Sequence, residues 1–175
     1  MTCSLTSHVH RLRQVTIAAA LTLALAASSR PVGAGIADSP LPVLIAGETT
    51  IHLYSVPGVI RAGGLATFFS CTSTDTASMQ VGVEVFGPAG GAPINDPVAT
   101  SLSVAPGATV TFGSAAVGIS ISSDLAFGGV SKGSARILAT SRKLACTAFV
   151  ADQGNAPPTS SWQLTIIKKT KQKGE

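Results

Sequence analysis

His52 is the residue best suited to acid–base chemistry, because histidine titrates close to neutral pH. It lies in the segment 49–55, TTIHLYS, on the polar side of an alternating pattern. Glu48 precedes it by four positions and could orient the imidazole of a general base that activates a serine. We expect no nucleophile elbow to present such a serine. His52 is therefore only a weak catalytic candidate, predicted to be a surface or half-buried strand histidine.

A pair of carboxylates could also perform chemistry, in the manner of a glycoside hydrolase. Glu84 falls within a predicted strand, at an outward-facing position. The aspartates fall in or beside predicted turns, where this side chain bonds nearby backbone amides; they are Asp75, Asp96, Asp124 and Asp152. Turn formation explains these aspartates better than catalysis does, so a small hydrolase using His52 or a carboxylate pair stays an alternative.

Metal and cofactor sites are not predicted. Asn95 and Asp96 could supply oxygen ligands to calcium, but the Asp-rich spacing of a calcium loop is missing. Two cysteines are too few ligands for structural zinc. The glycine-rich stretches 87–91 and 128–134 lack the Gly-Lys-Ser/Thr order of a phosphate-binding loop.

Cys71 and Cys146 are predicted to form a disulfide. They are 75 positions apart, and both lie on apolar faces of predicted strands. An exported chain meets an oxidising compartment in which such a bridge forms and persists. We expect the bridge to join two sheets, with a stabilisation of roughly 4–5 kcal/mol from loop entropy.

The rest of the chain alternates apolar and polar residues between turn signals, a pattern typical of β-strands. Strands are predicted at 49–55, 65–73, 79–86, 118–122 and 162–167, with two hairpins at 101–112 and 133–152. Pro57-Gly58 is predicted to be a turn. The fold class predicted is all-β: an antiparallel β-sandwich of about 8–9 short strands. Its strand spacing and Pro-Gly turns resemble those of bacterial immunoglobulin-like and jelly-roll modules, a likeness that implies a fold and no function.

The sequence predicts that the chain has four parts. Residues 1–34 combine a basic start, the apolar run 15–27 and small residues at 32–34, which together indicate a secretory signal peptide. The apolar run has 13 residues, whereas a helical membrane span needs roughly 20. We therefore expect no transmembrane segment and a secreted or periplasmic location. Residues 35–47 are predicted to be a linker, 48–168 the β-sandwich domain and 169–175 a basic, disordered tail.

The charge distribution argues against nucleic-acid binding. The formal net charge of +4 arises from basic residues in the leader and the tail, whereas residues 38–167 are slightly acidic. No basic stripe is left to follow a phosphate backbone.

Three residues could form a ligand surface. His52 and Tyr54 lie on one polar strand face, and Phe86 lies on the polar face of its own strand. We predict a secreted, non-catalytic binding, adhesion or accessory module for an extracellular protein or polysaccharide of unknown identity. The alternatives are the small hydrolase and a structural module that assembles through an exposed edge strand.

Overall fold

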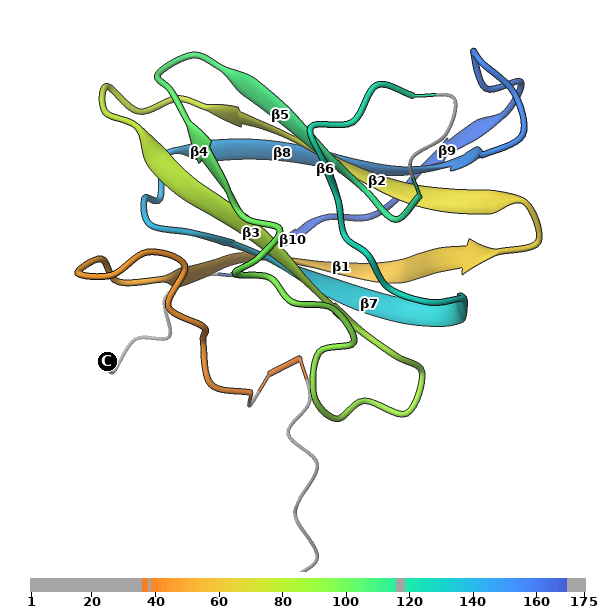
Figure 1. Ribbon diagram of the computed structural model, residues 1–175, viewed down its shortest axis with the longest axis horizontal. Coiled ribbons are helices and arrows are strands. Elements are labelled where there is room, and N and C mark those ends of the chain that lie inside the picture. Colours follow the sequence, from red (N-terminus) through yellow and green to blue (C-terminus); the bar gives the residue numbers. More distant parts are fainter. Residues whose placement is uncertain (1–35, 38, 116–118, 170–175) are drawn as a thin grey trace, which may run out of the picture. The chain divides into compact units, whose positions relative to one another are not determined.

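Ten β-strands and no helices make up the computed structural model, which describes residues 36–169 except 38 and 116–118 (Figure 1). These residues belong to one compact unit, Gly33–Glu175. The strands are β1 (Ile51–Ala62), β2 (Leu65–Ser73), β3 (Met79–Phe86), β4 (Leu102–Val104), β5 (Thr109–Gly113), β6 (Ser123–Asp124), β7 (Val130–Ala139), β8 (Leu144–Asp152), β9 (Ser161–Gln163) and β10 (Ile167–Lys168). The all-β prediction is confirmed.

Hydrogen bonds link all ten strands into one sheet. Its main path is β4-β3-β7-β1-β2-β5-β6; β10 pairs with β1, and β8 pairs with both β2 and β9. Every pairing is antiparallel except the short β5–β6 contact. The strands thus form one continuous sheet, nearly barrel-shaped and not clearly divided into the two layers of a sandwich.

The long strand β1 bends but does not end at its Pro-Gly pair. Pro57 lies opposite Ser134 of β7, and the register then shifts before Val59 lies opposite Gly133. Gly58 has a φ of 84°, which suits glycine. The turn predicted here is thus an irregularity inside a strand. The real turn follows at Gly63-Gly64, whose φ values of 60° and 76° match a two-residue hairpin between β1 and β2.

The two predicted hairpins contain the expected strands, but the pairing is wrong. β7 pairs with β1 and β3, whereas β8 pairs with β2 and β9. Likewise β4 pairs with β3, and β5 with β2 and β6. The strand predicted at 118–122 falls partly outside the described residues, and residues 119–122 form no strand. Alternation and a polar turn thus identified strands, but not their partners.

The disulfide between Cys71 and Cys146 is confirmed, but its place in the fold differs from the prediction. Cys71 on β2 lies directly opposite Cys146 on β8, with Cα atoms 4.1 Å apart. The bridge therefore joins neighbouring strands of one sheet instead of two sheets. The cysteines are 75 positions apart in the sequence, but the pairing of β2 with β8 makes them neighbours in one sheet.

The main core lies inside the curled sheet, where apolar side chains from the concave face of opposite strands pack together. Wholly buried members include Val56, Phe69, Val83, Phe112 and Ile137. A smaller cluster lies on the opposite face of β2 and β8, where Phe68 stacks on Phe149 with ring centroids 5.4 Å apart. Burial of these side chains is the main driving force for folding.

Candidate functional site

The outer face of β3, β7 and β1, directed away from the main core, carries the residues with the most chemistry. Strand register places them in rows. Gly82, Leu138 and His52 form one row; Glu84, Arg136 and Ser55 form the next. Because these rows cross three adjacent strands, residues from distant parts of the chain become neighbours.

Glu84 and Arg136 form a buried ion pair across β3 and β7. Glu84 lies on the outward face of its strand, as predicted, but it is buried there: the exposed fractions of Glu84 and Arg136 are 2% and 1%. The Arg136 guanidinium also donates to the carbonyl oxygens of Ser39 at 3.0 Å and Pro40 at 3.1 Å. Glu84 can be buried because Arg136 compensates its charge directly.

The segment of residues 39–47, here called the strap, covers these rows. It was predicted to be a linker, and in the structure it packs on the sheet. Leu44 of the strap is buried over Gly82: a Cβ atom at Gly82 would lie 2.9 Å from Leu44 Cδ2. The same Cβ would lie 3.1 Å from the carbonyl oxygen of Pro97, so the strap and the loop after β3 meet at this point. The absence of a side chain at Gly82 makes room for both.

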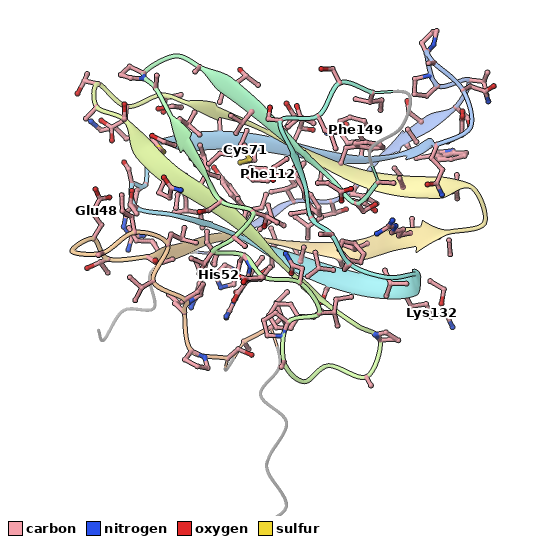
Figure 2. All side chains as sticks on the ribbon, viewed as in Figure 1. Glu48, His52, Cys71, Phe112, Lys132 and Phe149 are labelled. Atoms are coloured by element: carbon pink, nitrogen blue, oxygen red, sulfur yellow. A yellow bond between two sulfur atoms is a disulfide. The ribbon has the colours of Figure 1, made fainter. Side chains whose placement is uncertain are left out.

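His52 is buried beneath this cover, with an exposed fraction of 9%. Its Nε2 lies 3.0 Å from Ser55 Oγ and 3.1 Å from the carbonyl oxygen of Tyr54. Burial, followed by the positive charges of Lys169 and Arg136, lowers the pKa of His52 to about 4. The imidazole is therefore neutral at neutral pH. Figure 2 shows Glu48 well away from His52, so the expected orienting carboxylate is not beside it.

Tyr54 and Phe86, the other members of the predicted ligand surface, are also buried. Tyr54 faces the main core, because a register shift follows His52, and its hydroxyl donates to the carbonyl oxygen of Leu144. Burial raises its pKa. Phe86 is 1% exposed and lies under the Arg136 guanidinium, 5.3 Å from ring centroid to Cζ. These three side chains do not form an exposed surface.

Three of the aspartates bond groups of their own turns, whereas Asp75 bonds Ser141 and Lys143 of the turn between β7 and β8. Asp96 accepts from the backbone amides of Val98 and Ala99, and Asp124 accepts from that of Ala126. Hydrogen bonds, chiefly from Ser141 to Asp75 and from Asn155 to Asp152, lower the pKa of both carboxyl groups. These hydrogen bonds are those of turn and loop residues, the role that the sequence predicts for the aspartates.

A Gly-x-Ser-x-Gly spacing was missed in the sequence: it occurs at Gly129–Gly133 with Ser131 at its centre. The structure places Ser131 at an exposed position within β7, where the register with β1 shifts. A nucleophile elbow needs a sharp turn from a strand into a helix. The described residues contain no helix, so this motif does not form an elbow.

Exposed aliphatic side chains form a feature that sequence reasoning also missed, here called the ridge: Leu41, Val43, Ile45 and Val98. The first three alternate along the strap and are 40%, 63% and 44% exposed, while Leu44 between them is buried. Val98 is 44% exposed and follows Pro97, which meets the strap over Gly82. The signal was present in the sequence as the continuous apolar run PLPVLI at 40–45, which is unusual for a solvated linker.

An open groove of about 430 Å³ lies beside the disulfide. Its walls are Cys146 and Thr147 of β8 and the residues Gln163–Ile166 that connect β9 and β10. No buried side-chain nitrogen or oxygen of the described residues lacks a hydrogen-bond partner. The groove therefore contains no buried polar side chain that needs a ligand.

Among the described residues, no three His, Cys, Asp or Glu side chains gather as a metal site would require. No helix in this part of the chain is long and apolar enough to cross a membrane. Comparison of the chain with known protein families, with curated proteins and with solved structures finds no match.

Proposed function

We propose that the protein is a secreted, non-catalytic binding module, acting in adhesion or as an accessory protein, and that it makes contact through the ridge. The observation that carries this proposal is the ridge itself. Of the seven large hydrophobic side chains that are exposed among the described residues, four belong to the strap and to the loop that meets it. Exposed apolar patches on folded domains commonly mark interaction surfaces.

Export is part of the proposal. Residues 1–34 carry the sequence pattern of a signal peptide. They lie outside the described residues, which begin at Ile36. The disulfide is consistent with an oxidising extracellular compartment. We propose a secreted or periplasmic protein on these two grounds.

The proposed architecture is a two-layer sandwich. One layer would contain β4, β3, β7, β1 and β10, and the other β6, β5, β2, β8 and β9. The support is that β1 and β2 pair at only two positions, Arg61–Ala66 and Ala62–Leu65, next to their shared turn. The main core then lies between the two layers.

The alternatives receive less support. A hydrolase would need an accessible base, whereas His52 is buried and neutral. Assembly through an edge strand would need a long exposed edge. The edge strands β4, β6, β9 and β10 have two or three residues each, and the Asn95 side chain bonds the backbone of Val83 and Val85 at the rest of the β3 edge.

The proposal is tested by binding of the exported protein to three probes: lipid vesicles, insoluble polysaccharide and immobilised extracellular protein. We expect the double variant Val43→Ser/Ile45→Ser to lose binding to one probe, and His52→Gln to keep it. If the ridge variant binds every probe as the wild type does, the proposed function is wrong. Hydrolysis of ester or glycoside substrates that His52→Gln abolishes would support the enzyme instead.

A further inference from the structure

The backbone of Cys146 is directed away from β2. Cys71 and Cys146 lie opposite each other, with Cα atoms 4.1 Å apart. In an antiparallel pair, the opposed residues that are closer together, at about 4.5 Å, do not exchange hydrogen bonds, and their N–H and C=O groups point to the far side of each strand. The amide and the carbonyl of Cys146 therefore point to the side of β8 that is opposite β2.

The neighbouring hydrogen bonds follow the same alternation. Two residues further along β8, the carbonyl oxygen of Ala148 accepts from the backbone amide of Leu164 at 2.8 Å. At the end of the strand, the amide of Asp152 donates to the carbonyl oxygen of Ser160 at 3.3 Å. Alternate residues of β8 thus bond on the side where β9 lies, and Cys146 belongs to this set.

No described strand pairs with that side of Cys146. β9 pairs only with Phe149–Ala151, at the far end of β8 (Figure 1). After Leu164 the chain leaves β8 and crosses to β1, with which β10 pairs. The groove of about 430 Å³ lies where these two paths separate, and Cys146 forms part of its wall. Cys146 therefore presents one donor and one acceptor to an open groove.

The walls of the groove carry no charged side chain and include two aliphatic ones. Leu164 and Ile166 line it and also pack, half-buried, against the main core, as Cys146 does. Residues directly opposite each other in a pair of strands have their side chains on the same face of the sheet. A residue that pairs with Cys146 would therefore direct its side chain to the face of these aliphatic groups. The groove favours an apolar side chain at that position.

We infer that this groove binds an extended peptide, which pairs with Cys146 as an added antiparallel strand in line with β9. Addition of a strand to a sheet edge is a recurring mode of peptide recognition, in which main-chain hydrogen bonds provide affinity and side-chain pockets provide specificity. The disulfide holds Cys146 against β2, so the edge is a formed strand before the peptide arrives.

A second copy of this chain is a poorer occupant than a peptide. The available stretch of the edge lies between Leu144 and Ala148, whose carbonyl oxygens already accept from Tyr54 and Leu164. Joining two sheets edge to edge needs a longer row of unpaired groups. The site is separate from the ridge, and the inference goes beyond the proposed function.

Amide hydrogen exchange of the disulfide-bridged, exported protein, followed by NMR, tests the geometry first. Cys146 and Thr147 form a matched pair of amides, because the Thr147 amide points to β2 in this register. We expect the Cys146 amide to exchange faster than the Thr147 amide in the free protein. Equal protection of the two amides would overturn the inference, because the Cys146 amide would then already have a partner.

The binding probes are capped pentapeptides Thr-Thr-X-Thr-Thr with valine, leucine or phenylalanine at X. We expect at least one to bind and to slow exchange of the Cys146 amide. Methylation of the backbone nitrogen of X removes the donor to the Cys146 carbonyl oxygen and should weaken binding by about ten-fold. Methylation of the next threonine is the matched control, because that amide points away from β8 and its loss should leave binding unchanged.

Protein variants locate the contact. Thr165 is exposed on the groove wall, so Thr165→Trp should fill the groove and abolish peptide binding. Thr109→Trp is the matched control, since Thr109 is exposed on β5, on the other side of β2 from β8. Val43→Ser/Ile45→Ser, which tests the proposed function, should bind the peptides as the wild type does.

Three results of the binding experiments would overturn the inference. One is that none of the three peptides binds. Another is equal weakening by methylation at X and at the next threonine. The third is equal loss of binding in Thr165→Trp and Thr109→Trp. Peptide binding that only Val43→Ser/Ile45→Ser abolishes would move the contact to the ridge, so the groove site would fail while the proposed function survives.

Discussion

Two regions of the outer face of the sheet differ in how far their polar side chains are exposed to solvent. On β3, β7 and β1, the outward residues Glu84, Arg136 and His52 are buried beneath the strap. On β2, β5 and β8, the outward residues near the disulfide stay half-buried or exposed, such as Ser70, which lies between Thr111 and Thr147. Only farther along this face does the smaller cluster around Phe68 bury side chains. Both faces alternate with core residues in the same way. Alternation therefore identifies the outer face of a strand but cannot tell whether another segment covers it.

The difference lies in how the polar groups are satisfied. Hydroxyl groups on the open face need little from the protein, because water can hydrogen-bond to them; Thr72 meets Thr109 at 2.8 Å, and Thr111 donates to Ser70 at 3.4 Å. On the covered face, the charges of Glu84 and Arg136 compensate each other directly, and strap carbonyl oxygens accept a hydrogen bond from each terminal guanidinium nitrogen. A covered polar face thus requires matched partners, and their loss should cost far more than loss of an exposed hydroxyl.

The largest effect should come from Glu84→Ala. It leaves the Arg136 guanidinium buried without its counter-ion, and we expect a loss of about 3–5 kcal/mol in the free energy of unfolding, measured by urea denaturation. Asp75→Ala is the matched control, because it breaks an ion pair whose Lys143 side chain is 61% exposed. That control should cost much less, because water screens an ion pair at the surface. Equal losses for the two variants would show that the covered face is not energetically distinct.

Removal of the disulfide should have the next largest effect. In the unfolded chain the bridge closes a loop between residues 75 positions apart, and Cys71→Ala/Cys146→Ala removes this restriction. We expect the free energy of unfolding to fall by roughly 2–4 kcal/mol, measured by urea denaturation. β2 and β8 remain paired at nine positions without the bridge, so the circular dichroism spectrum should stay that of a β protein. Unfolding at neutral pH without denaturant would mean that strand pairing alone does not hold this face together.

Acidification should affect the covered face through His52. Its pKa in the folded protein, about 4, lies below the ordinary 6.5, so the unfolded chain binds more protons between these values. Stability should therefore fall as pH drops from 6.5 to 4, by about 2 kcal/mol, and be retained above pH 6.5. Asp75 and Asp152 have lowered pKa values and contribute only at more acidic pH. The variant His52→Gln should flatten the unfolding free energy across this window; an unchanged slope would assign the effect to other groups.

The smallest effect should come from the open face. Thr72→Ala removes one of two hydroxyls that meet at the surface, and we expect a change within about 0.5 kcal/mol. Thermal or urea unfolding measures it beside Glu84→Ala. A loss above 2 kcal/mol would indicate that the open face is covered in solution, by a partner or by another copy.

Local sequence signals predicted local structure well. β2 and β3 occupy the residues expected for them, and the cysteine pair was identified from apolar strand positions and export. Strand pairing was not predictable from the sequence of the turns. The turn at Gly63-Gly64 joins strands that pair with each other, whereas the turn after Ala139 carries the chain to another part of the sheet, and residue types in the two turns do not distinguish these cases. The predicted ligand surface failed for a related reason: only tertiary packing shows that His52 and Phe86 are buried, Phe86 beneath the Arg136 guanidinium.

The most direct test is the intact mass of the protein recovered after export from a bacterial host, measured without reduction. The account predicts the mass of residues 35–175 less two hydrogens, which retains the strap and contains the Cys71–Cys146 bridge. An uncleaved chain with two free thiols would contradict the proposed export. A chain cleaved beyond Ile45 would contradict the functional proposal as well, because the mature protein would lack most of its ridge.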